Sequence, residues 1–244
     1  MKDLQAWPTE EPFIDKHEYP SIVILGGFAS PSGIYTGFAR ALARHSRCPV
    51  SVVDAETVDW IPSIAAVGWL ILLHKLNRTV RKAYAAHQER VTLIGHSAGG
   101  VLARLYLGDL SFFGRRYDGK RWVEHVITLG SPHYNEQRWL HGGLMSRWTQ
   151  KRYPDAHFAG EVRYTSVAGR VIQGQKDGTA REQLAYRSYR RLCRDGTQWG
   201  DGIVPALSAL LEGSKKIELE QVSHFRGFGT PWYGDDEVIE RWWP

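Results

Sequence analysis

The sequence predicts an α/β protein, with a mostly parallel sheet that carries helices on both faces. Short apolar runs alternate with stretches of helical spacing along most of the chain. This alternation is typical of parallel strands that are joined by crossover helices. The chain has 244 residues, of which 43% are hydrophobic, and this is enough for one large core. We therefore expect a single domain over residues 1–244.

Six apolar runs are predicted to be strands, because runs of Val, Ile and Leu that end at Gly or at a polar residue are typical of buried parallel strands. These runs are 21–27, 50–54, 91–95, 123–130, 162–168 and 217–222. Helices are predicted from apolar spacing over 33–45, 64–86, 98–107 and 235–242. Residues 1–20 are expected to form an irregular arm.

Two regions, about 134–160 and 169–200, interrupt the alternation and are predicted to be lid or cap insertions. The first is rich in Trp, His, Tyr and Gly, and the second is polar and basic. Such insertions border the crevice where parallel sheets bind ligands. A helix that begins near residue 138 would place Leu140, Leu144 and Trp148 on one apolar face. That face would gate a pocket or touch lipid, and ordinary core packing is the alternative.

Charge and composition exclude several classes of function. The net charge of +5 comes from scattered Lys and Arg residues without a long basic tract, so we expect no nucleic-acid partner. A peripheral attraction to anionic membrane surfaces is the alternative interpretation of this charge. The sequence has no metal-ligand spacing, no P-loop and no dinucleotide fingerprint, so neither a metal nor another cofactor is expected.

The start of the chain and its longest apolar run predict a soluble or peripheral, cytoplasmic protein. The first 20 residues include several acidic ones and lack the apolar segment of a signal peptide. The run over 64–73 is shorter than the roughly 20 residues that a helix needs to cross a bilayer. Two Cys are typical of free thiols in a reducing compartment.

Residues 91–100, VTLIGHSAGG, contain the pattern Gly-x-Ser-x-Gly between a predicted strand and a predicted helix. In this context the Ser lies on a tight turn, and close approach of the strand and the helix requires small residues such as Gly95 and Gly99. The turn raises the Ser97 hydroxyl above the sheet, beside a helix N-terminus that favours negative charge. The pattern predicts that Ser97 is a nucleophile; a glycine-rich structural turn is the alternative.

Four short blocks make the sequence similar to lipase-type α/β-hydrolases. They are VTLIGHSAGG followed by ARLYL, ITLGSPH at 127–133, GDGIVP at 200–205, and the late His224. The ending PWYGDDEVIERW also resembles uncharacterised hydrolases of cyanobacteria and plastids. The resemblance implies the α/β-hydrolase fold, a lid insertion and the serine chemistry of an esterase or lipase. It does not extend into the two insertions.

The base and the acid of this superfamily follow the nucleophile in the chain. The resemblance assigns the base to His224, which follows the last predicted strand. The other histidines after Ser97 are His125, His133, His141 and His157. Of these, His125 lies within a strand pattern and is expected to pack in the core.

The resemblance assigns the acid to Asp201, which has Gly on both sides and lies between the fifth and sixth predicted strands. Its role would be to hold one tautomer of His224 and to stabilise the imidazolium. Asp177 and Asp195 are rivals in polar segments. A simple Asp-Gly turn is the alternative interpretation of Asp201.

The oxyanion hole is predicted at the backbone N–H groups of Ala98 and Phe28. Ala98 directly follows the nucleophile, and Phe28 lies in the loop after the first strand, where two glycines let the backbone turn inward. Leu25 stands where the family often carries a His, so the residue that supplies the second N–H group is defined only to within one position.

The predicted activity is hydrolysis of a carboxylic ester with an apolar part, either a small molecule or a lipid, through an acyl-enzyme. Residues expected in the substrate pocket or lid are Gly27, His96, His133, Trp139, Leu144 and Trp148. An acyltransferase, a thioesterase or amidase, and a phytyl-ester (chlorophyll-type) hydrolase are alternatives with the same triad. A non-catalytic binding protein on a hydrolase scaffold is a further alternative, although it would not need all three residues.

Overall fold

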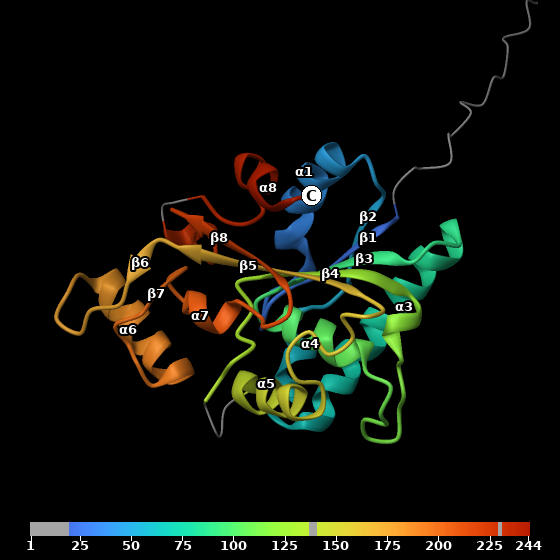
Figure 1. The fold of residues 1–244 in the computed structure, drawn as a ribbon, viewed down its shortest axis with the longest axis horizontal. Coiled ribbons are helices and arrows are strands. Elements are labelled where there is room, and N and C mark those ends of the chain that lie inside the picture. The colour runs from blue at the N-terminus through green and yellow to red at the C-terminus, as the bar shows by residue number, and fades with distance from the viewer. Residues whose placement is uncertain (1–19, 137–140, 229–230) are drawn as a thin grey trace, which may run out of the picture.

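The computed structural model describes residues 20–136, 141–228 and 231–244. Its centre is a six-stranded sheet with strand order β2-β1-β3-β4-β5-β8, in which every neighbouring pair is parallel (Figure 1). The strands are β1 Ile22–Leu25, β2 Val50–Val52, β3 Val91–His96, β4 Val123–Leu129, β5 Arg163–Arg170 and β8 Lys215–Glu220. The predicted fold class, a mostly parallel sheet with helices on both faces, is confirmed.

Helices cover the sheet on both faces (Figure 1). One face carries α1 (Thr36–Ser46) and α8 (Asp236–Trp242), and the other carries α3 (Trp69–His87) and α4 (Ala98–Leu107). The remaining helices are α2 Thr57–Trp60, α5 His141–Arg152, α6 Ala180–Cys193 and α7 Ala206–Ala209. Within the described ranges, none of the helices combines the length and apolar character that crossing a bilayer requires.

Two hydrophobic cores lie on opposite faces of the sheet, and alternate residues of each strand contribute to them. In β1, Val23 and Leu25 belong to the core that includes α3 and α4, whereas Ile22 and Ile24 belong to the core of α1 and α8. Successive strand residues point to opposite faces, so a strand that is covered on both sides is apolar throughout. This is why β1 appears in the sequence as an uninterrupted apolar run.

Helices α1 and α8 come from opposite ends of the described chain and pack against each other. The ring of Phe38 in α1 lies 6.1 Å from that of Trp242 in α8, in an edge-to-face arrangement. Both side chains are almost completely buried. At the surface, Arg44 donates to both carboxylate oxygens of Asp236 at 2.8 Å.

The predicted helix over 64–86 begins later, at Trp69. The residues before it form two 3-10 turns, Ile61–Ile64 and Ala66–Gly68. The chain folds back so tightly here that a Cβ on Gly68 would lie 2.0 Å from the carbonyl oxygen of Pro62. The indole N–H of Trp69 then donates to the Ser63 carbonyl at 3.0 Å, and this bond fixes the start of the helix.

Two small strands, β6 (Ile172–Gln173) and β7 (Trp199–Gly200), form an antiparallel pair beside the main sheet. Helix α6 lies between them in the sequence, so the predicted insertion over 169–200 is a helix between two short strands. In the main sheet the strand order reverses between β1 and β3, and parallel sheets bind ligands at the carboxyl ends of strands at such a point.

Candidate active site

Ser97 lies on the turn between β3 and α4 with φ 54° and ψ −126°, a conformation that residues with a Cβ rarely adopt. The turn is tight because three chain segments meet there. A Cβ on Gly95 would lie 2.4 Å from the Cα of Gly100, and a Cβ on Gly99 would lie 2.4 Å from the carbonyl oxygen of Leu25. Small residues at these positions therefore allow the strained turn that the sequence pattern predicts.

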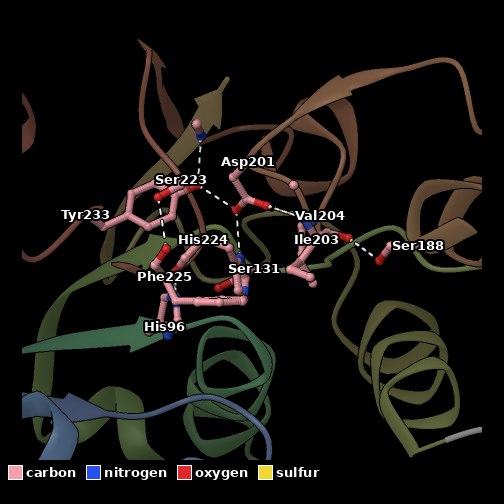
Figure 2. Close-up of polar contacts among 12 residues, drawn as sticks. His96, Ser131, Ser188, Asp201, Ile203, Val204, Ser223, His224, Phe225 and Tyr233 are labelled. Atoms are coloured by element: carbon pink, nitrogen blue, oxygen red, sulfur yellow. Dashed lines mark hydrogen bonds and ion pairs between the residues drawn. The ribbon is translucent and has the colours of Figure 1, made fainter. Parts of the chain in front are cut away.

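His224 and Asp201 lie in contact beside this turn (Figure 2). The Nδ1 atom of His224 is 2.7 Å from Oδ2 of Asp201, and the His224 backbone N–H donates to the Asp201 carbonyl at 2.9 Å. Asp201 is fully buried and His224 is 6% exposed. Two hydrogen bonds thus hold the imidazole against the carboxylate, and Nδ1 is the ring atom that donates.

Asp201 accepts further hydrogen bonds that account for its complete burial. Its Oδ1 accepts from the backbone N–H groups of Ile203 at 3.0 Å and Val204 at 2.7 Å, and its Oδ2 also accepts from the Tyr233 hydroxyl at 2.8 Å (Figure 2). A buried carboxylate requires such donors, because an unpaired charge in the interior is very costly. The rivals Asp177 and Asp195 are both exposed.

Tyr233 is a site residue that sequence reasoning did not identify. Its hydroxyl accepts from the Gly169 N–H at 2.7 Å and gives its own proton to Asp201. Burial, together with the nearby Asp201 charge, raises the pKa of Tyr233 well above its usual value. Tyr233 is therefore a neutral donor to the carboxylate at neutral pH.

Ser97 and His224 line one pocket of about 640 Å³ at the carboxyl ends of β1 and β3. Predicted pocket residues Gly27 and His96 line it as well. Its other walls are mostly apolar, and sequence reasoning did not identify most of them: Phe28, Ile34, Phe38, Ile203, Phe225 and Trp232. The pocket therefore combines Ser97 and His224 with a mostly apolar lining.

The remaining predicted pocket residues with described side chains lie elsewhere. His133, Leu144 and Trp148 border a second hollow on the α5 side of the sheet and are not among the described residues that line the Ser97 pocket. His133 is fully buried, with Nε2 3.0 Å from Thr128 Oγ1 and Nδ1 3.3 Å from Arg104 Nη1. Trp139 and Leu140 lie outside the described residues.

Helix α5 and the residues after it are held to α4 by Arg104, which is 1% exposed. The guanidinium of Arg104 donates to Gln150 Oε1 and to the carbonyl of Tyr153, each at 2.8 Å, and to the carbonyl of Asp155 at 3.0 Å. The Trp148 ring packs edge-to-face on Phe112 at 4.8 Å. These contacts make α5 part of the packed structure, so the prediction of a gating apolar stripe at Leu144 and Trp148 does not fit them.

His125 lies in the core, as its strand pattern predicts, and its Nε2 is 2.9 Å from Thr165 Oγ1. Burial, with a smaller effect of Arg163, lowers the pKa of His125 to about 4. Among the residues that the structure describes, no cluster of three or more His, Cys, Asp or Glu side chains could hold a metal ion.

The predicted oxyanion donors lie on either side of Ser97. Ala98 is the first residue of α4, where backbone N–H groups have no partner within the helix. The loop after β1 passes so close that a Cβ on Gly27 would lie 2.9 Å from the Cβ of Ser97. The Gly27 N–H donates to the Tyr35 hydroxyl at 2.8 Å, which favours Phe28 as the second donor.

Comparison with known proteins gives the class to which this fold corresponds. Residues 69–185, just under half of the chain, match the family model described as a PGAP1-like alpha/beta domain. No curated protein matches the chain. Among solved structures, the mature form of the Bacillus licheniformis lipase BlEst2 is 18% identical, with a TM-score of 0.63 over 96% of this chain and 92% of that one.

A second similar structure is the phospholipase PlaB from Legionella pneumophila in complex with thio-NAD, at 15% identity and a TM-score of 0.52. The match covers 78% of this chain and 44% of that one. The chain therefore has the α/β-hydrolase fold. Both of these similar structures are those of lipolytic enzymes, and at these identities the likeness to them is one of fold.

Proposed function

We propose that the protein is a serine hydrolase that cleaves carboxylic esters with an apolar acyl or alcohol part. The observation that carries this proposal is the arrangement of three residues. Ser97 lies on a strained turn, shares a pocket with His224, and His224 Nδ1 lies 2.7 Å from the buried Asp201 carboxylate. This is the set of roles that nucleophilic acyl transfer requires.

In the proposed reaction, Asp201 holds Nδ1 of His224 protonated, which leaves Nε2 as the base. Nε2 takes the proton of Ser97 Oγ while Oγ attacks the ester carbonyl carbon. The N–H groups of Ala98 and Phe28 donate to the oxyanion that forms. His224 then protonates the leaving alcohol, and water hydrolyses the acyl-enzyme by the same steps in reverse order.

The apolar walls of the pocket support an ester with an apolar part. Ile34 and Phe225 are large side chains that remain 58% and 44% exposed, and both line the pocket with Ser97. Exposed apolar side chains that gather around a concave site are typical of a binding surface for apolar ligands.

The test is covalent labelling of Ser97 with a fluorophosphonate, followed by turnover of p-nitrophenyl esters of increasing chain length. The parent protein should be labelled at Ser97 and should hydrolyse the esters. Ser97→Ala should lose both the label and nearly all turnover while keeping the parent unfolding temperature, because Oγ forms the covalent intermediate. A folded parent protein without label or turnover would indicate the non-catalytic binding protein instead.

A further inference from the structure

A chain of hydrogen bonds runs beneath the pocket and connects three loops of the site. The Gly27 N–H donates to the Tyr35 hydroxyl at 2.8 Å, this hydroxyl lies 2.8 Å from Nδ1 of His96, and Nε2 of His96 lies 3.1 Å from the carbonyl oxygen of His224. The chain thus passes from the loop after β1, through the residue before Ser97, to the loop after β8.

The direction of every proton in this chain follows from its two ends. The Gly27 N–H can only donate, so the Tyr35 hydroxyl accepts there; Nδ1 of a neutral His96 is an acceptor when Nε2 carries the proton, so the Tyr35 hydroxyl gives its own proton to Nδ1. The carbonyl of His224 can only accept, so Nε2 of His96 carries the ring proton. Both ring nitrogens of His96 are therefore used, and one tautomer of the neutral ring satisfies both partners.

Burial keeps this chain neutral. Tyr35 is 1% exposed and His96 is 4% exposed. Burial, with a smaller contribution from neighbouring His224, lowers the pKa of His96 well below its usual value. The two imidazole rings lie 4.7 Å apart, so a charged His96 would repel the imidazolium that His224 forms during the proposed reaction. A neutral His96 supports the position of His224 without that repulsion.

The loop after β1 depends on Tyr35 for its position over Ser97. The Tyr35 ring fills the space above Gly26, where a Cβ would lie 2.5 Å from its Cε2 atom. Its hydroxyl holds the next peptide by the Gly27 N–H, directly before the proposed oxyanion donor Phe28. Oxyanion donors act only when they are held at hydrogen-bond distance from the developing charge, so a small shift of this loop would lower the rate.

We propose that Tyr35 and His96 are positioning residues, which hold the oxyanion loop and the His224 loop in fixed relation across the turn of Ser97. This inference rests on the proposed function and adds to it two residues that act through Gly27 and His224. The Tyr35–His96 pair joins parts of the site that are far apart in the sequence, since the hydrogen bond from His96 to His224 spans 128 residues.

The principal test is Tyr35→Phe, which removes one hydroxyl and leaves the ring in place. We expect kcat for p-nitrophenyl butyrate to fall about 10- to 100-fold with KM unchanged, because misplaced donors stabilise the transition state less than the bound substrate. The affinity for a trifluoromethyl ketone, which forms a hemiketal oxyanion on the serine, should fall by the same factor. If Tyr35 had only a structural role, Tyr35→Phe would not lower the ketone affinity and kcat by the same factor.

The matched control is Tyr106→Phe. Tyr106 is equally buried, but its hydroxyl donates to Asn77 at 3.1 Å, away from the pocket residues. Its kcat and ketone affinity should stay within about twofold of the parent values, since Tyr106 is not among the described residues that line the Ser97 pocket. If Tyr35→Phe also kept the parent kcat and ketone affinity, or if both variants lost them equally, the positioning role would be overturned.

His96 supplies an independent variant in case Tyr35→Phe does not fold. His96→Gln keeps an acceptor and a donor, so it should retain more activity than His96→Leu, which keeps neither. Adding Tyr35→Phe to His96→Leu should cost little more, because the two residues act as one unit. Equal activity of the Gln and Leu variants would contradict the inference. Full turnover by Ser97→Ala would instead contradict the proposed function itself.

Discussion

Asp201 illustrates how a single side chain is specified by its partners. Its carboxylate accepts from His224, Tyr233 and two backbone N–H groups, so every acceptor position that burial removes from water has a donor. A carboxylate is the only side chain of this size that accepts from all four without offering a proton of its own. An amide in the same place would turn an N–H group toward at least one of these donors.

The first prediction follows from this arrangement. Asp201→Asn should lower kcat on the order of 10³- to 10⁴-fold, because the amide no longer holds the His224 tautomer that leaves Nε2 free as a base. Steady-state kinetics with p-nitrophenyl butyrate measures the loss. Asp195→Asn is the control: Asp195 is exposed and accepts from nearby Thr197 and Gln198, so its kcat should remain within about twofold. A large loss of kcat in Asp195→Asn, with a near-parent kcat in Asp201→Asn, would indicate that Asp195 is the acid.

At this scale, sequence reasoning finds residues that carry a local signal. Ser97 lies in a motif whose glycines are required by the turn, and Asp201 and His224 lie in blocks that resemble those of known hydrolases. Tyr35 lies in no such block, and Tyr233 lies in an ending that resembles only uncharacterised hydrolases. Neither role was predicted, because both depend on contacts between distant segments. Tyr233 reaches Asp201 across 32 residues, and nothing in the residues around it indicates that contact.

At the scale of elements, the substrate pocket and the predicted lid are separate. The pocket is bordered by the loop after β1 and by the segment that follows His224. Helix α5, which carries the predicted apolar stripe, instead contacts Arg104 of α4 and Phe112 in the loop after α4. We therefore expect chain-length preference to depend on the first two segments.

The second prediction tests that expectation. Ile34→Ala and Phe225→Ala should each lower the ratio of kcat/KM for p-nitrophenyl octanoate to kcat/KM for p-nitrophenyl acetate by about tenfold. The reason is that a shortened side chain removes apolar contact only from the longer acyl chain. Leu144→Ala is the control, since Leu144 is similarly exposed at 41% but borders the other hollow. A selective loss for octanoate in the Leu144 variant would restore α5 as the acyl wall.

The third prediction concerns the attachment of α5. Arg104→Met should lower the free energy of unfolding by about 3–5 kcal/mol, because the carbonyls of Tyr153 and Asp155 and Nδ1 of His133 lose a buried donor. Denaturant unfolding measures this change, with exposed Arg187→Met on α6 as the control. A loss below about 1 kcal/mol would show that water replaces the guanidinium at little cost.

Elements with a strong apolar period were predictable, and those without one were not. Helix α4 was predicted with the same bounds that the structure gives, since every one of its residues is buried. Helix α6 buries only Ala185 and Tyr189, so it lacks an apolar stripe. Its one sequence signal is the capping box, in which Thr179 accepts from the Glu182 N–H and the Glu182 side chain accepts from the Thr179 N–H.

At the scale of the whole molecule, three buried histidines connect stability to pH. Burial lowers the pKa of His96 and His133 well below the usual value, with smaller effects of His224 and Arg104 respectively, and it lowers that of His125 to about 4. Each of them is neutral in the folded protein but takes up a proton below about pH 6.5 in the unfolded chain. Acid therefore favours the unfolded chain.

The fourth prediction gives the sign and the size of this effect. The stabilisation that the folded protein has with these histidines neutral is fully present above pH 6.5. As the pH falls toward the folded-state pKa, the free energy of unfolding decreases by up to about 1.4 kcal/mol per pH unit for each histidine. Denaturant unfolding at pH 7.5 and 5.5 measures the slope, before most carboxylates titrate. His125→Asn should reduce the slope by about one third, whereas surface His157→Asn should leave it unchanged. Equal slopes in all three proteins would contradict the assignment.

The contact between α1 and α8 determines when this fold can be completed during synthesis. Phe38 leaves the ribosome well before its ring partner Trp242, which belongs to the last helix of the described chain. Until that helix has emerged, one apolar face of α1 and of the central strand β1 lacks part of its cover. Between the synthesis of α1 and that of α8 the nascent chain therefore exposes apolar surface, and transiently exposed surface of this kind favours aggregation.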